Sequence, residues 1–299
     1  MCGIVGLFIK NPKLESQLGQ LVAPMLIEMS ERGPDSAGIA VYRNQTDENG
    51  CKLTLLAPSD DYDWSALKTE LSSAFGETSV NPMVNHAVAT FPASIQSVSE
   101  WVQANRPELH INSAGHAIEI FKEKGLPATV IDRYNMSAMQ GTHALAHTRM
   151  ATESAVTTEH SHPFSTGEDV CLVHNGSLSN HNVLRRELQK KGIEFKTDND
   201  SEVAAGYLAW RMREGDDLDT ALNNAIRDLD GFYTFAIGTK DGFAVLRDPI
   251  GCKPAVMAET DDWAAMSSEF RAIATLPGAE NARIWEPQPA KIYSWKRAA

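Results

Sequence analysis

The sequence has few cysteines and few basic side chains, and each shortage excludes a class of protein. Its 299 residues include only four cysteines, none of them in a Cys-x-x-Cys pair. We therefore expect neither a disulfide framework nor a thiolate zinc site, and we expect a reducing, cytoplasmic location. Only 27 lysine and arginine residues accompany 39 acidic residues, which gives a net charge of −12. A surface of this sign repels phosphate backbones, so nucleic acid is not an expected partner.

Long hydrophobic runs are also missing. The first ten residues contain no basic segment before their apolar stretch ends at Lys10, so no secretory signal peptide is expected and only Met1 is expected to be removed. The longest apolar runs are far shorter than the roughly 20 residues that span a bilayer, which argues against a membrane protein. With 42% hydrophobic and 22% charged residues, the composition is that of an ordinary globular protein.

The spacing of apolar residues predicts alternating strands and helices. The first half indicates a strand at 4–9, a helix over 14–29 with a kink at Pro24, and an α/β insertion at about 43–140. Within the insertion we expect, among other elements, a helix near 114–124 and a strand at 129–131. After residue 144 we expect strands at 144–147, 170–174, 232–238, 242–247, 255–258 and 290–295, and helices over 182–191, 201–214 and 218–229. No repeat or linker is visible, so residues 2–299 are expected to form one domain interrupted by the insertion.

The first candidate for chemistry is Cys2. Once Met1 is removed, residue 2 carries a thiol and a free α-amine, whose reference pKa is roughly 7.7 to 8.0. The amine can take the thiol proton directly or through a water molecule, so no histidine partner is needed. Taken alone, a cysteine at this position is more often a small buried hydrophobic residue than a nucleophile.

Two arginine segments follow. The run 32–38, Arg-Gly-Pro-Asp-Ser-Ala-Gly, fits a plain turn because glycine and proline favour one. Arg149 comes at the end of a short expected strand, where its guanidinium could bind a carboxylate with two parallel hydrogen bonds. A surface ion pair is the simpler interpretation of a single arginine.

Two further segments offer polar groups. Asn175 and Gly176 could supply an amide and a backbone N–H to a developing oxyanion, although Asn-Gly is also the commonest signal for a tight hairpin. Asn199 and Glu202 fit a capping box at the start of a helix. Asp200 between them could cap the same helix or pair with the ammonium group of a ligand.

Taken together and in this order, these segments resemble the class II glutamine amidotransferase domain of the N-terminal nucleophile hydrolases. The motifs that carry the resemblance are Cys-Gly-Ile-Val-Gly at 2–6, Arg-Gly-Pro-Asp-Ser-Ala-Gly at 32–38, His-Thr-Arg-x-Ala-Thr at 147–152, His-Asn-Gly at 174–176, Asp-Ser-Glu at 200–202, Leu-Asp-Gly-Phe-Tyr at 229–233, Arg-Asp-Pro-Ile-Gly at 247–251 and Ser-Ser-Glu at 267–269. The resemblance covers the chain outside the insertion. It implies an α+β fold, a four-layer α/β/β/α sandwich of mainly antiparallel sheets.

The resemblance also implies roles. Cys2 would attack the side-chain amide of L-glutamine, and its α-amine would act as base and then as acid toward the leaving ammonia. Asn175 and the Gly176 N–H would hold the oxyanion of the tetrahedral intermediate. Arg149 would bind the glutamine α-carboxylate and Asp200 its α-ammonium. The positions of Arg32 and Thr152 match family residues that line the pocket. Both are therefore expected to complete the substrate-binding set.

Some features depart from the family pattern or compete with it. Met150 stands where relatives often have tryptophan, and the insertion is longer than in compact relatives. His160 and His162 lie on a loop without a third ligand, so they are expected to be polar loop residues and no metal is predicted. No cofactor is predicted for this chain either.

The pathway is inferred from the resemblance as well. The chain resembles stand-alone amidotransferase subunits related to glutamate synthase, such as the A subunit of N-methylglutamate synthase. Its expected partners are then L-glutamine and separate synthase subunits that carry flavin and iron–sulfur centres. Two other functions remain open: an amide or peptide hydrolase of the same superfamily, and a regulatory subunit that senses glutamine without turnover.

Overall fold

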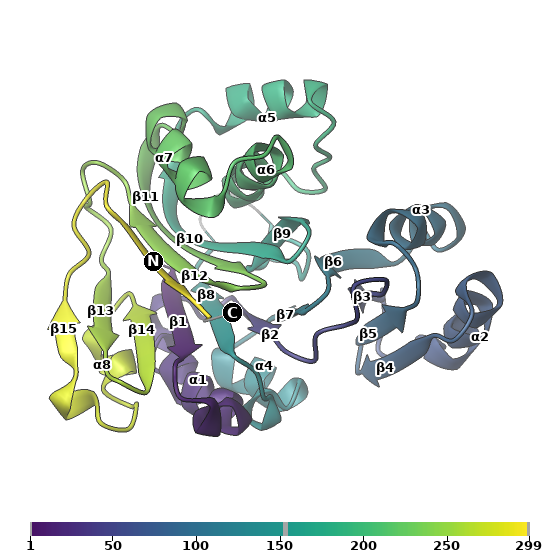
Figure 1. Ribbon diagram of the computed structural model, residues 1–299, viewed down its shortest axis with the longest axis horizontal. Coiled ribbons are helices and arrows are strands. Elements are labelled where there is room, and N and C mark those ends of the chain that lie inside the picture. The colour runs from purple at the N-terminus through teal and green to yellow at the C-terminus, as the bar shows by residue number, and fades with distance from the viewer. Residues whose placement is uncertain (1, 152–154, 298–299) are drawn as a thin grey trace.

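The computed structural model describes residues 2–151 and 155–297, and two large antiparallel sheets form most of it (Figure 1). The seven-stranded sheet has β1 near its centre. Its strands, in order across the sheet, are β15 (Arg283–Trp285), β13 (Val256–Glu259), β14 (Trp263–Ser267), β1 (Gly3–Ile9), β8 (His143–Arg149), β2 (Ser36–Tyr42) and β7 (Ile118–Lys124). The five-stranded sheet contains, in order, β16 (Ile292–Lys296), β12 (Gly242–Arg247), β11 (Gly231–Thr239), β10 (Val170–Leu178) and β9 (Phe164–Gly167).

Helices cover the outer face of each sheet (Figure 1). Those on the seven-stranded sheet are α1 (Leu18–Ile27), α4 (Pro127–Arg133) and α8 (Phe270–Ile273), and those on the five-stranded sheet are α5 (His181–Lys190), α6 (Asp200–Arg213) and α7 (Leu218–Asp228). Short 3-10 turns occupy Pro12–Gln17, Ser30–Arg32, Met136–Ala138 and Ala279–Asn281. The helix expected over 14–29 is therefore divided between the first of these turns and α1, and Pro24 lies inside α1.

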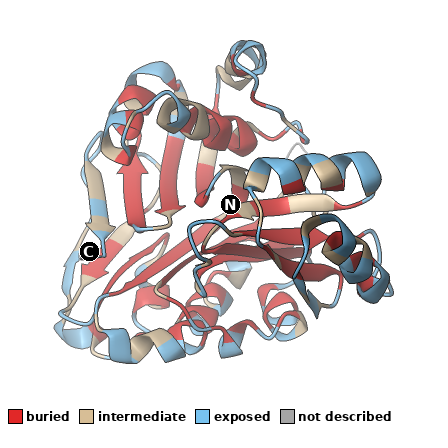
Figure 2. Ribbon diagram, turned by 45° about the vertical axis from the view of Figure 1, so that its right-hand side comes forward, coloured by how far each residue is buried: buried red, intermediate tan, exposed pale blue. Residues whose placement is uncertain are grey.

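The alternation of side chains along β1 shows how the layers are held together. Val5 and Leu7 point into the apolar layer beneath α1, whereas Ile4 and Phe8 point into a second layer between the two sheets. Because both faces of the strand are covered, all seven residues are buried (Figure 2). A third layer lies under α5, α6 and α7. The order of layers is helix, sheet, sheet, helix, which confirms the predicted four-layer sandwich.

The insertion is a smaller unit beside the sandwich (Figure 1). Its four-stranded sheet contains, in order, β4 (Ser79–Met83), β5 (His86–Phe91), β3 (Cys51–Leu56) and β6 (His110–Gly115). The helices α2 (Trp64–Phe75) and α3 (Ile95–Asn105) pack on this sheet around a separate hydrophobic core. Asp63 caps α2 by accepting a hydrogen bond from the Ala66 N–H.

The end of the insertion differs from the prediction. Residues 118–124 form β7 of the seven-stranded sheet, and 127–133 form α4. The helix expected near 114–124 and the strand expected at 129–131 are therefore both wrong, and the separate sheet and its helices lie within 51–115. The cause is β7, whose buried Glu119 and Lys122 interrupt the apolar pattern of a strand covered on both faces.

Polar contacts join the insertion to the sandwich. The buried carboxylate of Glu119 accepts hydrogen bonds from Lys52 at 3.0 Å and Arg43 at 2.8 Å. Burial lowers the pKa of Lys52, and Glu119 acts against this shift. The carboxylate of Asp169 accepts backbone N–H groups at 116–118, where the chain passes back into β7. In the described ranges 2–151 and 155–297, no helix combines the length and apolarity needed to cross a membrane.

Candidate active site

Cys2 and Arg149 lie side by side at one end of the seven-stranded sheet. The antiparallel register of β1 and β8 pairs Gly3 with Thr148, so the residue before one and the residue after the other are neighbours. Cys2 is partly exposed, whereas the side chain of Arg149 is buried. The predicted nucleophile and the predicted carboxylate-binding residue therefore come together at adjacent strand ends.

The start of β1 is fixed by a serine pair for which the sequence analysis gave no role. The Ile4 N–H donates to Ser268 Oγ at 3.0 Å, and the Ser267 hydroxyl donates to the Ile4 carbonyl at 3.2 Å. The Ser268 N–H donates to the same carbonyl at 3.0 Å. Strand β14, which was not predicted, brings both serines there. The sequence signal for these residues was the Ser-Ser-Glu motif at 267–269, which ends an apolar run and is shared with the family.

Arg32 holds the backbone of the candidate nucleophile. Its Nε donates to the Cys2 carbonyl at 3.0 Å, and its Nη1 donates to the Glu269 carboxylate at 2.7 Å. The charge–dipole contact fixes the plane of the peptide that follows Cys2, because the guanidinium is planar and rigid. Its buried Nη2 has no hydrogen-bond partner within the described residues. Arg32 Nη2 is therefore the atom that is available for the pocket role predicted for this residue.

The rest of the Arg-Gly-Pro-Asp segment supports the end of β8. A Cβ at Gly33 would lie 2.6 Å from the Arg149 nitrogen, so only glycine lets the turn approach this closely. The Asp35 N–H donates to the Arg149 carbonyl at 3.0 Å, and the Asp35 carboxylate accepts the Ala151 N–H at 2.8 Å. The segment runs from the 3-10 turn that ends at Arg32 into β2, which begins at Ser36, and it positions Arg149.

Asn175 and Gly176 lie within strand β10, so the interpretation of Asn-Gly as a tight hairpin is wrong. Gly176 pairs with Tyr233 of β11 and has φ +153, and a Cβ there would lie 1.9 Å from the Phe232 carbonyl oxygen. Glycine is thus required where the two strands approach. Asn175 is 4% exposed, and its amide nitrogen has no hydrogen-bond partner within the described residues. A buried amide donor without a partner suits an oxyanion that arrives with a ligand.

A hydrogen bond between the sheets brings β10 to the end of β8. His147 Nε2 and the His174 carbonyl oxygen lie 3.0 Å apart. Arg149 is two residues beyond this link on one sheet, and Asn175 is the next residue on the other. Cys2 and Arg149 at the end of the seven-stranded sheet therefore lie near the same hydrogen bond as Asn175 and Gly176 in β10.

Asp200 begins α6 beside the same strand. Its Oδ2 accepts the Leu178 N–H at 2.9 Å, and its Oδ1 lies 3.8 Å from His174 Nδ1. Asn199 caps the helix by accepting the Ser201 N–H at 2.9 Å. Asp200 is therefore not the capping residue, and its carboxylate keeps acceptor capacity for a ligand.

The predicted capping box is only half present. Glu202 does not return to Asn199. Its carboxylate accepts the Lys196 N–H at 2.9 Å, the Thr197 N–H at 2.8 Å and the Thr197 hydroxyl at 2.7 Å. Glu202 therefore ties the chain that leads into Asp200 back onto α6.

Electrostatics link the separate elements. Burial lowers the pKa of Arg149, and the charges of Cys2, Asp198 and Asp200, among others, act to raise it. The guanidinium thus lies in the field of the candidate nucleophile and of the candidate ammonium ligand. Arg149 also donates to the Ala155 carbonyl at 2.9 Å. Thr152, the remaining predicted pocket residue, lies outside the described residues, and Met150 is 39% exposed.

Histidines surround the link between the sheets. Burial lowers the pKa of His147 to about 3 and lowers that of His174, so both are neutral near pH 7. His162 is not the polar loop residue that was expected, because it is buried and stacked on His147 with ring centroids 3.9 Å apart. His160 instead binds Asp198 at 3.0 Å. Across the parts of the chain that the structure describes, no cluster of three or more metal-binding side chains is found.

Comparison with known proteins identifies the class. A family model described as a glutamine amidotransferase domain matches residues 147–275. The chain is 54% identical to the glutamine amidotransferase-like protein GlxB of Rhizobium meliloti (strain 1021), over 99% of this chain and 98% of that protein. It belongs to the class II glutamine amidotransferases, enzymes of the N-terminal nucleophile hydrolase type.

Two more distant relatives extend this result. A putative glutamine amidotransferase of Methanothermobacter thermautotrophicus is 32% identical over 98% of this chain and 99% of its own length. The structure of glutamine phosphoribosylpyrophosphate amidotransferase from B. subtilis superimposes with a TM-score of 0.62 at 20% identity. The match covers 99% of this chain and 49% of that protein, so this chain spans about half of it. This last comparison shows a shared fold.

Proposed function

We propose that this chain is a glutaminase subunit that hydrolyses L-glutamine to glutamate and ammonia through a γ-glutamyl thioester on Cys2, and passes the ammonia to a separate synthase subunit. The observation that carries the proposal is the convergence of Cys2 and Arg149 at adjacent strand ends with the unpartnered amide of Asn175 on the facing sheet. Free thiols at all four cysteines fit a reducing cytoplasm as the place of action.

Each proton transfer and each bond change in the proposed reaction is assigned to a specific group. After Met1 is removed, the α-amine of Cys2 takes the thiol proton and Sγ attacks the side-chain carbonyl carbon of glutamine. Asn175 Nδ2 and the Gly176 N–H donate to the oxyanion that forms. The carbon–nitrogen bond breaks as the ammonium of Cys2 returns its proton to the leaving ammonia. Water then attacks the thioester, the amine again accepts a proton, and glutamate leaves with the thiol restored.

Substrate recognition is proposed to use opposite charges. Arg149 binds the α-carboxylate and Asp200 binds the α-ammonium, so the site selects a free amino acid. The Nη2 atom of Arg32 and the side chain of Thr152 complete the pocket in this proposal. The same charge pair disfavours the alternative of a peptide or amide hydrolase, since a peptide bond would remove one of the two charges.

The fate of the ammonia is proposed from the resemblance to stand-alone subunits. The synthase partner would carry flavin and iron–sulfur centres and would make glutamate or N-methylglutamate. Affinity capture of the chain from its native host should recover a redox-cofactor synthase. Recovery of a sugar or purine synthase would instead place the ammonia in another pathway.

The central test replaces the nucleophile. Cys2→Ala should abolish glutamate release from L-glutamine, whereas Cys252→Ala, at an exposed free cysteine, should leave the rate unchanged. Intact-mass analysis of active protein should show that Met1 is absent. Full activity with Met1 retained, or an unchanged rate in the Cys2 variant, would refute the mechanism. Retained Met1 together with glutamine binding but no turnover would support a sensing role instead.

Specificity is tested with the substrate. L-glutamine should be hydrolysed at least a hundredfold more efficiently than N-acetyl-glutamine, which lacks the ammonium that Asp200 is proposed to bind. Comparable rates for the two compounds would favour the amide hydrolase alternative.

A further inference from the structure

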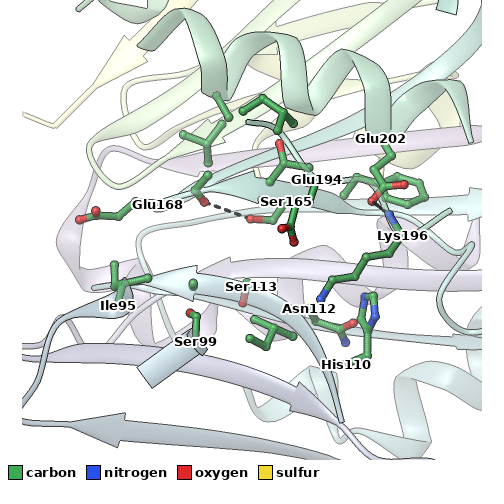
Figure 3. A pocket seen from close by; sticks show the side chains of 18 of the residues that line it. Ile95, Ser99, His110, Asn112, Ser113, Ser165, Glu168, Glu194, Lys196 and Glu202 are labelled. Atoms are coloured by element: carbon green, nitrogen blue, oxygen red, sulfur yellow. Dashed lines mark hydrogen bonds between the residues drawn. The ribbon is translucent and has the colours of Figure 1, made fainter. Parts of the chain in front are cut away.

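A cavity lies between the insertion and the sandwich, and Cys2, Arg149 and Asn175 do not line it (Figure 3). Its volume of about 770 Å³ falls in the range of sites that bind small organic molecules. One wall comes from β6 and α3 of the insertion. The other comes from β9, the chain at 192–197 and α6 of the sandwich.

Three polar groups in the cavity are available to a ligand. The side chain of Lys196 is exposed to the cavity and extends toward the side on which His110 and Asn112 lie (Figure 3). Within the described ranges, the structure shows no ion pair to its ammonium group. Asn112 is 3% exposed, and its Oδ1 has no hydrogen-bond partner there. The same holds for the buried Oγ1 of Thr166. Buried polar atoms are normally paired, so these atoms indicate an occupant.

The remaining lining limits the charge and shape of that occupant. Apolar side chains such as Ile111, Val170 and Met212 form much of the surface. Glu194 and Glu168 also face the cavity, so a polyanion such as a nucleoside triphosphate would be repelled. Lys196 can neutralise one negative charge, and Asn112 Oδ1 needs a donor. The fitting ligand has one carboxylate, a nearby N–H or O–H group and an apolar body.

We propose that this cavity binds a small monocarboxylate of that kind, an apolar α-amino or α-hydroxy acid, and that its binding strengthens the binding of glutamine. Lys196 receives the carboxylate, Asn112 Oδ1 accepts from the α-ammonium or α-hydroxyl group, and the side chain of the ligand packs on the apolar wall. The binding itself is independent of the catalytic proposal, whereas the regulatory effect rests on the proposed glutaminase function.

The coupling runs through the chain between the cavity and Asp200. The backbone N–H groups of Lys196 and Thr197 are both held by Glu202 of α6. Arg185 of α5 donates to the Thr197 carbonyl at 2.7 Å and to the Asn199 carbonyl at 3.0 Å. A ligand that holds Lys196 therefore acts on a short segment that is tied to α5 and α6 and ends at the proposed ammonium-binding carboxylate. A shift of this segment is passed through these hydrogen bonds to Asp200, which is how the cavity is proposed to affect glutamine binding.

Calorimetric titration of the full chain tests the binding. The probes are L-leucine, 2-hydroxy-4-methylpentanoate, 4-methylpentanoate, which lacks the donor, and L-leucinamide, which lacks the carboxylate. The first two should bind, and the last two should bind at least about tenfold more weakly. Lys196→Gln should abolish binding of the first two. Lys191→Gln, which removes an exposed lysine outside the cavity, should leave it intact. No binding by either acid, or equal binding by Lys196→Gln, would overturn the site.

Kinetics test the coupling and separate it from failure of the catalytic proposal. Saturating 2-hydroxy-4-methylpentanoate should lower the KM for glutamine by about fivefold or more with little change in kcat. In calorimetric titrations of the inactive Cys2→Ala variant, each ligand should tighten the binding of the other by the same factor. Lys196→Gln should keep the basal KM and lose the effect. A probe that occupied the glutamine site would raise KM instead, which would overturn the proposal. If glutaminase activity is absent, the calorimetric result still decides whether the cavity is a binding site.

Discussion

Two buried asparagines, one in each region of the molecule, have a side-chain atom without a hydrogen-bond partner in the described structure. In Asn175 of the sandwich the atom is the amide nitrogen, and in Asn112 of the insertion it is the carbonyl oxygen. The first can donate to a developing anion, and the second can accept from a ligand that carries a donor. The same residue type thus presents opposite hydrogen-bonding groups in the two regions.

The surroundings of the two asparagines differ in how they are packed. Asn175 is held in a paired strand beside Gly176, where the close approach of β11 leaves no space for a side chain. Asn112 faces a cavity whose two walls belong to separately packed hydrophobic cores. A catalytic donor has to be placed before the oxyanion forms. The cavity beside Asn112 instead has room for a small molecule.

The largest effect is expected at Asn175. Asn175→Ala should lower kcat about 10²- to 10³-fold with little change in KM, because the lost donor acts mainly on the transition state. Asn112→Ala is the matched control in the insertion and should keep the basal kcat. Steady-state glutamate release by both variants measures the contrast. Equal losses in the two would contradict the assignment of catalysis to the sandwich.

The insertion core provides the second contrast. Leu55 in β3 is fully buried in the core of the insertion, and Leu172 in β10 is fully buried in that of the sandwich. Leu55→Ala should destabilise the insertion by about 2–5 kcal/mol while kcat at 25 °C stays near the wild-type value. Leu172→Ala should cost a similar free energy and should also reduce kcat, since it loosens the strand of Asn175. Calorimetric unfolding and activity measured together would show whether stability and catalysis separate in this way.

The same contrast explains what the sequence could predict. Motifs around Cys2 and Arg149 led to the fold and to residues that the structure brings together, because each motif uses a glycine or charged residue for a specific close approach. Gly33 beside Arg149 is an example. The insertion offered no such motif. There, buried charges such as Glu119 disrupted the apolar spacing, and a strand of the main sheet was predicted as a helix.

Other features depend on long-range pairing, which local spacing does not contain. The partnership of Ile4 with Ser268 joins residues 264 positions apart, and the family motif at 267–269 marks the serine without indicating its partner. The contact between Arg32 and Glu269 is of the same kind. The Asn-Gly pair at 175 was ambiguous for the opposite reason, since its local signal is that of a hairpin and only β11 determines that it lies within a strand.

Two neighbouring acids sharpen the comparison within the sandwich. Asp200→Asn should raise the KM for glutamine about 10- to 100-fold, because a charge-assisted hydrogen bond to the α-ammonium is lost while the contact to the Leu178 N–H can be kept. Asp198→Asn is the control, since this exposed side chain binds His160 and not the Leu178 N–H. It should change KM by less than about threefold. Kinetics at low ionic strength would detect the difference, and equal effects would remove Asp200 from the substrate site.

The smallest effect concerns pH. Burial lowers the pKa of His143 in β8 to about 3, so the folded state keeps it neutral while the unfolded state binds a proton below about pH 6.5. Stability contributed by this residue is therefore complete above that pH and falls as the pH drops toward 3, by about 1.4 kcal/mol for each pH unit.

His86 in the insertion has the same shift and the same physical cause. Urea unfolding between pH 7 and 4.5 should show a slope reduced by about one proton in either His143→Gln or His86→Gln. If the insertion unfolds separately, the two variants will change the slopes of different transitions, and this result would show directly whether the two cores are independent.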